Sequence, residues 1–328
     1  MKVLELAKNL TKPKSVYLIC GEDAFLARLA LTTLKNALVP NFSDINLVNV
    51  DANIDAQTLF EMLQAYPFGD EYRLIVINDF KPKKPTSKSG GDLSNVIATH
   101  AKAGSSQSII VLYAPGEDVA KDFLGAEIVD ASHLSAYELG QWINNEIKSR
   151  GAKITPCAVN KLIEFTLLDL SRISTELNKL IDYKSGGEIT EKDVELFVAK
   201  DKEYQVFEIQ DKIAKGDSVA VFDIIETIMR NEKNAFSIIT PLYNNYRRAL
   251  FVSLHKQESD EELARLLQIK PYAVKMLRPQ VAMFSPKKLK KISSMLYALD
   301  NDIKNGRINE NIGLIKTISN ILLIRKEG

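Results

Sequence analysis

A turn that could bind phosphate follows the first apolar segment of the chain, residues 16–20, and begins at Gly21. A phosphate-binding loop needs the pattern G-x-x-x-x-G-K-[ST], because its backbone N–H groups and its lysine hold the phosphates. At the offsets that require Gly, Lys and Ser/Thr, this chain has Leu26, Ala27 and Arg28. The residue types needed to hold a nucleotide are therefore missing from this turn.

Acidic residues in and near the same turn also argue against a bound phosphate. Glu22 and Asp23 lie inside it, and their carboxylates would repel a phosphate. Asp79 follows the third apolar segment without the neighbouring Glu that would complete a magnesium-and-base pair. The G-x-G-x-x-G fingerprint of dinucleotide-binding folds is also missing from the sequence. The sequence thus argues against nucleotide hydrolysis.

Other reactive residue types are scattered. The histidines and cysteines show none of the usual metal-ligand spacings and are His100, His133, His255, Cys20 and Cys157. There is no G-x-S-x-G nucleophile motif. Arg172 could act as an arginine finger, but an ion-paired or solvated arginine on a helix is the favoured interpretation. We therefore expect no catalytic residues, no cofactor and no metal, and we expect the cysteines to be buried free thiols.

The composition is that of an ordinary folded protein, with 328 residues, 45% hydrophobic and 26% charged. This length suggests two or three domains and excludes a disordered or fibrous chain. A net charge of +1 argues against a protein that coats DNA with an overall basic surface. No apolar run approaches the roughly 20 residues of a membrane helix. We expect a soluble, cytoplasmic protein without membrane contact.

The elements that position these residues alternate in the first third of the chain. Apolar runs typical of buried strands are separated by helical patterns, including 23–38 and 55–65. The predicted strands are 16–20, 45–50, 74–77, 109–113 and 127–129. This alternation predicts a parallel sheet with helices on both faces. Residues 81–91, rich in Lys, Pro and Gly, are predicted to be a mobile surface loop.

Only helical periodicity is predicted beyond residue 135. The predicted helices are 136–150, 156–165, 169–183, 190–198, 206–215, 218–229, 235–257, 260–267, 272–283, 286–305 and 310–325. Pro271, Pro279 and Pro286 are expected to end or kink helices. The predicted domains are an α/β domain over 1–134, a small helical domain over 135–201 and a larger helical domain over 202–328.

Five stretches, in this order and spacing, resemble the delta subunit family of bacterial DNA polymerase III, a component of the sliding-clamp loader. They cover the opening strand and its acidic turn, an aromatic turn before the third strand, and three helical segments. The stretches are 16–26, 66–77, 177–194, 207–217 and 269–274. The resemblance spans all three predicted domains.

The resemblance implies an AAA+-like fold that has lost its ATPase chemistry: a RecA-like α/β domain, a helical lid and a C-terminal helical collar. In that family the subunit binds the ring-shaped beta sliding clamp and holds one interface open during replication. The resemblance further implies ATP-binding loader subunits and a second non-motor subunit as partners, in a hetero-pentamer. Primed DNA is also implied as a partner, contacted through this complex. The chain itself would be a non-catalytic subunit of a nucleotidyltransferase holoenzyme.

The family contacts the clamp with an apolar tip at the end of the helix before the third strand. Here the matching residues are Leu63, Tyr66, Pro67 and Phe68. Two aromatic residues and a proline at a turn predict a rigid apolar knob, of the kind that anchors interfaces. The family often shows two adjacent large apolar residues, but Gly69 follows Phe68 here, so Tyr66 or Leu63 is the candidate second anchor. The alternative is that Phe68 only covers the edge of the sheet.

Charge is distributed unevenly along the chain: residues 270–328 carry +8 and residues 1–269 carry −7. Four lysines, Lys287, Lys288, Lys290 and Lys291, lie near the start of a predicted helix. They could contact DNA or an acidic partner. A solvated helix face with Leu289, Ile292 and Leu296 turned inward is slightly favoured, because no aromatic residues are interleaved with the lysines. A salt titration of primer–template binding separates the two.

Two other functions remain open. The chain could be a nucleotide-dependent enzyme with a degenerate phosphate loop, which a test with radiolabelled ATP would reveal. It could also be the loader's other catalytically silent subunit, but that relative usually carries zinc-ligand cysteines. Cys20 and Cys157 cannot form a four-ligand site.

Overall fold

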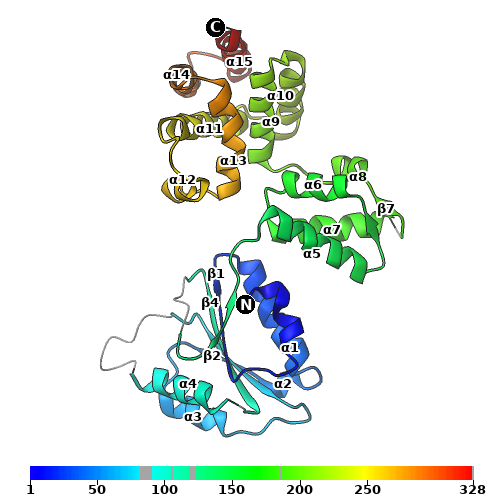
Figure 1. Cartoon of the computed structure of the whole chain (residues 1–328). Helices are drawn as coiled ribbons and strands as arrows, with labels where there is room; N and C mark the ends of the chain where they lie inside the picture. The colour runs from blue at the N-terminus through cyan, green and yellow to red at the C-terminus, as the bar shows by residue number, and fades with distance from the viewer. Residues whose placement is uncertain (82–90, 105, 118–122, 185, 327–328) are drawn as a thin grey trace. The chain divides into compact units, whose positions relative to one another are not determined.

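The computed structural model describes residues 1–81, 91–104, 106–117, 123–184 and 186–326 (Figure 1). The chain divides into two compact units, Met1–Glu138 and Leu139–Gly328. The division between Glu138 and Leu139 lies close to the predicted boundary at 134. The predicted boundary between 201 and 202 falls inside the second unit and stays a prediction.

The first unit is built on a parallel five-stranded sheet in the order β2-β3-β4-β1-β5. Its strands are β1 Val16–Gly21, β2 Leu47–Asp51, β3 Arg73–Asn78, β4 Ser108–Pro115 and β5 Glu127–Asp130. One row of paired residues crosses the sheet and consists of Val50, Ile77, Leu112, Leu18 and Ile128. The central strands are buried along most of their length, as their continuous apolar sequences predict.

Helices cover both faces of this sheet. They are the short 3₁₀ helix η1 Val3–Asn9, α1 Ala24–Leu38, α2 Ser43–Asn46, α3 Ala56–Leu63 and α4 Gly91–Ala103. Figure 1 shows α1 on one side of the sheet and α3 with α4 on the other. Leu59 of α3 and Ile97 of α4 pack into the core with Leu18 and Leu112. The RecA-like α/β fold is therefore confirmed.

Two expectations for this unit need correction. The second strand was predicted to begin at Ile45, but Ile45 and Asn46 belong to the short helix α2 and the strand begins at Leu47. Helix α4 was not predicted, because its polar sequence carries only a weak apolar stripe. Most of the predicted loop 81–91, namely residues 82–90, lies outside the described residues.

Four helices and a small sheet follow, and the first of these helices starts within the last three residues of the first unit. The helices are α5 Ala136–Ser149, α6 Pro156–Phe165, α7 Leu170–Lys184 and α8 Glu191–Phe197. Strands β6 Lys153–Ile154 and β7 Glu188–Ile189 pair in parallel. The expectation of helices alone beyond residue 135 was therefore wrong. A strand of two residues is too short to show an alternating pattern.

Seven further helices form the C-terminal bundle. They are α9 Lys202–Lys215, α10 Ser218–Glu232, α11 Phe236–Leu254, α12 Asp260–Leu267, α13 Pro271–Met283, α14 Pro286–Lys304 and α15 Glu310–Lys326. The prediction that α9 starts at Val206 was wrong, because Asp201 accepts the Glu203 N–H at 2.8 Å and starts the helix earlier. Pro271 and Pro286 stand at the first turns of α13 and α14, so they begin helices rather than end them.

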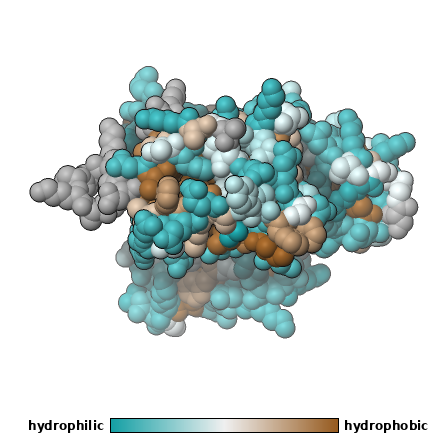
Figure 2. Space-filling view, turned by 90° about the horizontal axis from the view of Figure 1, so that it is seen from below, coloured by the Kyte–Doolittle hydropathy of each residue, from teal (hydrophilic) through white to brown (hydrophobic). Residues whose placement is uncertain are grey.

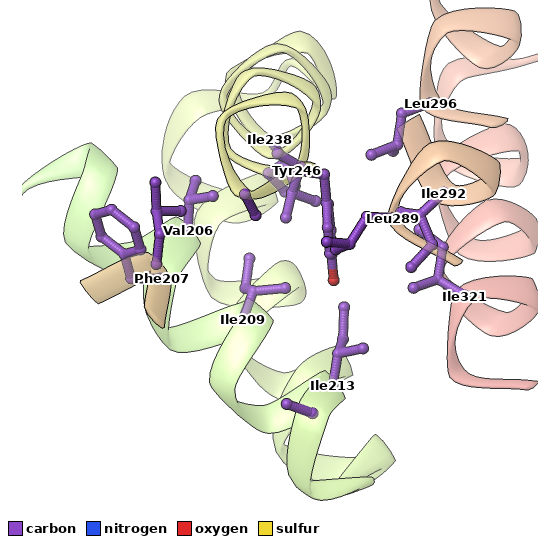
Figure 3. Packing of buried hydrophobic residues seen from close by; sticks show 14 of the residues in the cluster. Val206, Phe207, Ile209, Ile213, Ile238, Tyr246, Leu289, Ile292, Leu296 and Ile321 are labelled. Carbon is purple, nitrogen blue, oxygen red and sulfur yellow. The ribbon is translucent and has the colours of Figure 1, made fainter. Parts of the chain in front are cut away.

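The core of this bundle is a continuous apolar cluster. In Figure 3 the buried ring of Tyr246 lies between Ile209 and Ile213 of α9 and the apolar side chains of α14. Leu289 and Ile292 reach it from α14, with Ile321 of α15 beside them. The all-helical C-terminal part of the fold is confirmed. Within the described part of the chain, no helix is long and apolar enough to cross a membrane.

Candidate functional site

The predicted contact residues lie at the end of α3, which ends at Leu63, and in its connection to β3, which begins at Arg73. Tyr66 is 84% exposed and Phe68 is 58% exposed, whereas Pro67 is half-buried. Leu63 is half-buried and packs against the core of the first unit. The turn therefore presents two aromatic rings to the outside, and Leu63 fastens the end of α3 to the core.

The buried side chain of Asn46 fixes the backbone of Phe68. The Phe68 N–H donates to Asn46 Oδ1 at 2.8 Å, and Asn46 Nδ2 donates to the Phe68 carbonyl, also at 2.8 Å. Asn46 Nδ2 also donates to Asp70 Oδ2 at 2.9 Å. Asn46 is fully buried, so these bonds are shielded from water and hold Phe68 in one backbone conformation.

Asp70 ties the same turn to the segment after α1. Its Oδ1 accepts from the backbone N–H and the side-chain Nδ2 of Asn41, both at 3.1 Å. Its Oδ2 accepts from the Phe42 N–H at 2.9 Å. Desolvation would raise the pKa of Asp70, but these donors and Asn46 outweigh it and hold the pKa below the ordinary value. The carboxylate is therefore ionised and braced at neutral pH.

An aromatic residue that the sequence did not single out completes this surface. The ring of Phe42 meets that of Phe68 edge to face, with centroids 5.2 Å apart and an interplanar angle of 83°. Phe42 is 40% exposed and Ile45, in the adjoining α2, is 51% exposed. No periodicity marked either residue, because the contact joins segments that are far apart in the chain. Only the Asn-Phe-Ser-Asp run at residues 41–44, across the start of α2, could have indicated a turn here.

Apolar residues thus reach the surface around this turn from two segments. The exposed large apolar residues here are Phe42, Ile45, Tyr66 and Phe68, and we refer to these four as the tip. Figure 2 shows patches of hydrophobic surface among hydrophilic side chains on the face seen from below. Exposed apolar groups gathered in this way mark a contact surface more often than single ones do.

The turn after β1 holds a carboxylate where a phosphate site would hold its anion. Asp23 caps α1: its Oδ1 accepts from the N–H groups of Phe25 at 2.9 Å and Leu26 at 3.1 Å. These are the donors that would face a bound anion. His133 Nδ1 lies 3.2 Å from Asp23 Oδ2. Burial raises the pKa of Asp23, but the bonds from His133 and from Leu26 outweigh it and the pKa lies below its ordinary value.

Backbone contacts also close this turn from behind. Gly21 has a φ of +128°, and a Cβ on it would lie 2.4 Å from the carbonyl carbon of Ala131. The Ala131 N–H donates to the Cys20 carbonyl at 2.7 Å, and the Asp23 N–H donates to the Ala131 carbonyl at 3.0 Å. The chain therefore packs directly against the turn, and a carboxylate already occupies the N-terminus of α1.

Arg172 is ion-paired, as the favoured interpretation predicted. It contacts the Asp201 carboxylate, and its Nη2 donates to the Ala199 carbonyl at 3.1 Å. Beside it, Lys200 pairs with Glu208 at 2.8 Å. The contacts of Arg172 link α7 to the start of α9.

The four lysines singled out in the sequence lie in the first turns of α14. Ser285 caps the helix and accepts the Lys288 N–H at 3.3 Å. Leu289, Ile292 and Leu296 are fully buried, so the predicted inward face is confirmed. The exposed lysines are Lys287, Lys290 and Lys291, with Lys288 half-buried. Contact of this face with DNA or an acidic partner stays a prediction.

No group of three or more potential metal ligands comes together among the residues that the structure describes. Cys20 is buried, as expected, whereas Cys157 is exposed, so the expectation of burial was wrong for Cys157. His100 Nε2 donates to the Ser108 carbonyl at 2.8 Å, and burial lowers the pKa of His100.

Comparison with known proteins connects this chain to one family. Residues 17–125 match the family described as "DNA polymerase III, delta subunit", and residues 203–321 match "DNA polymerase III delta subunit, C-terminal domain". The chain is 24% identical to the DNA polymerase III subunit delta of Bacillus subtilis, over 94% of each chain. It is 23% identical to the probable DNA polymerase III subunit delta of Aquifex aeolicus, over 79% of this chain and 76% of that one.

A solved structure supports the fold over the whole length. The chain is similar to the Bacillus subtilis DNA clamp loader delta protein with a TM-score of 0.76 and 22% identity, covering 98% of this chain and 99% of that one. The two family matches lie in order on the α/β unit and the C-terminal bundle, and the similarity to the solved structure extends over both parts. The chain belongs to the delta subunit family of DNA polymerase III.

Proposed function

We propose that this chain is the clamp-binding subunit of a bacterial clamp loader, and that it binds the beta sliding clamp and helps to open it for loading onto primed DNA. The observation that carries the proposal is the exposed aromatic turn at Tyr66 and Phe68, held by the buried Asn46. The name of the similar Bacillus subtilis structure, a clamp loader delta protein, supports it.

The tip suits an apolar pocket on a folded partner. Because Phe68 is 58% exposed, burying the rest of its ring contributes about 1–2 kcal/mol. Because Asn46 already fixes its backbone, little conformational entropy is lost on binding. The chain opens the clamp only to the extent that it binds the open ring more tightly than the closed one. A rigid anchor favours such discrimination, since it cannot adapt equally to both forms.

We also propose that the chain has no active site of its own. Asp23 caps the N–H groups that a nucleotide phosphate would need, and Leu26, Ala27 and Arg28 replace the phosphate-loop residues. ATP would then be bound by the partner subunits of the loader. The chain would join them and the second non-motor subunit through its C-terminal helices. The same capped turn speaks against the alternative of a nucleotide-dependent enzyme.

The test is co-purification of the full-length chain with the sliding clamp and with the ATP-binding loader subunits. We expect the chain to form a complex with the clamp alone, and to enter a larger assembly with the loader subunits. The chain alone should retain no radiolabelled ATP. Stable ATP binding by the isolated chain, together with no clamp complex, would favour the enzyme instead.

A further inference from the structure

We propose that Phe42 is a second anchor of the tip, and that Phe42 and Phe68 enter the partner as one preassembled edge-to-face pair. This inference rests on the proposed function and specifies the surface that the partner must offer. That surface is an apolar pocket wide enough for two aromatic rings, with basic residues at its rim.

The two rings already form the pair in the free chain. Their centroids are 5.2 Å apart at 83°, which is a favourable aromatic geometry. Phe42 nevertheless remains 40% exposed and Phe68 58% exposed. A pair formed only to fill the core would be buried, so the exposed parts of both rings are available to a partner.

Gly69 shows that Phe42 takes the place of a side chain in the turn itself. A Cβ on Gly69 would lie 2.3 Å from Cε2 and 2.5 Å from Cδ2 of the Phe42 ring. The ring therefore covers the backbone directly after Phe68. The second large apolar group of the turn is supplied from the segment after α1, rather than by the next residue in the sequence.

One polar network holds both anchors. The Phe42 N–H donates to Asp70 at 2.9 Å, and the Phe68 N–H donates to Asn46 at 2.8 Å. Asn46 and Asp70 are themselves bonded at 2.9 Å. The backbones of the two anchors are thus fixed relative to each other before any partner arrives, which lowers the entropy cost of binding.

The charge around the pair identifies the rim of the partner's pocket. Residues 39–46 and 64–72 contain Asp44, Asp70 and Glu71 but no Lys or Arg. Asp44 and Glu71 are exposed, and each lies within a few residues of an anchor. Electrostatic complementarity therefore requires a basic rim, and association should slow as salt is added.

The experiment measures the affinity of the full-length chain for the purified sliding clamp by surface plasmon resonance. We expect Phe42→Ala and Phe68→Ala each to weaken binding about tenfold or more. The double variant should lose less than the product of the single losses, because either deletion already breaks the pair. Tyr137→Ala, at a 75% exposed aromatic residue of the same unit, is the matched control and should bind as the unmodified chain does.

A second readout separates contact from support. The photo-crosslinking residue p-benzoylphenylalanine placed at position 42 should crosslink to the clamp, and the same residue at position 137 should not. If Phe68→Ala weakens binding while Phe42→Ala binds normally and position 42 gives no crosslink, the second anchor is refuted and the proposed function stands. If the unmodified chain does not bind the clamp, the proposed function itself fails.

Discussion

Replacing Asn46 by alanine should loosen the tip while the rest of the chain stays folded. Asn46 is fully buried, and its side-chain amide bonds the turn through the Phe68 N–H, the Phe68 carbonyl and Asp70. Alanine removes all three bonds and leaves the Phe68 peptide groups without their buried partner. The effect should therefore be confined to the turn.

The size of the effect follows from the two bonds to the Phe68 backbone, both 2.8 Å long. A neutral hydrogen bond contributes about 1 kcal/mol, so the turn should lose about 2 kcal/mol of local stability. This corresponds to an opening equilibrium about 30-fold more favourable. Clamp affinity should fall as well, because part of the binding energy is then spent on ordering Phe68.

Hydrogen exchange at the Phe68 amide measures this directly, since exchange there follows local opening of the turn. Asn41→Ala is the matched control: Asn41 is exposed and its side chain makes only one bond to Asp70, at 3.1 Å. It should change exchange at Phe68 only slightly. Equal exchange rates in the Asn46 variant and the unmodified chain would refute the assignment of Asn46 as the residue that fixes the tip.

Three further predictions concern stability. Gly69→Ala should cost about 1–2 kcal/mol, because its φ is +70° and the added carbon displaces Phe42, measured by thermal unfolding. Gly116→Ala, with a φ of +84° and open space, should cost less, and equal losses would contradict the crowding. The lowered pKa of Asp70 means that its stabilising effect is present above the ordinary Asp pKa and is lost as pH falls through the folded value. Unfolding measured between about pH 6 and about pH 3 should show a smaller acid-dependent loss in Asp70→Asn than in the unmodified chain, and an identical pH profile would be the contrary result. Asp23→Ala should lower the free energy of unfolding by about 1 kcal/mol through the lost helix cap, without creating ATP binding; an unchanged unfolding midpoint would argue against the cap.

The sequence predicted the sheet well, because buried parallel strands are continuous apolar runs. The segment that begins at Val16 illustrates this, since every residue to Cys20 is buried. It also predicted a turn at Phe68, where Pro67 and Gly69 interrupt the helical pattern. These features are local, and each is visible within a few neighbouring residues.

The parts that were missed depend on contacts between distant segments. Phe42 becomes part of the tip only because β2 and β3 pair and bring its segment beside the aromatic turn. Asn46 was assigned to a strand, since a polar residue among apolar ones also fits a half-buried strand. Its three bonds lie across the chain and have no signature in the sequence.

The account depends most on Phe68, and its central claim is tested by the affinity of the full-length chain for the purified beta clamp. Surface plasmon resonance should show binding that Phe68→Ala weakens about tenfold or more, while the variant stays folded with a thermal unfolding midpoint only slightly lowered, because the ring is 58% exposed. Tyr137→Ala should bind as the unmodified chain does. A Phe68→Ala variant that is folded and binds the clamp with unchanged affinity would contradict the claim that this turn is the clamp contact.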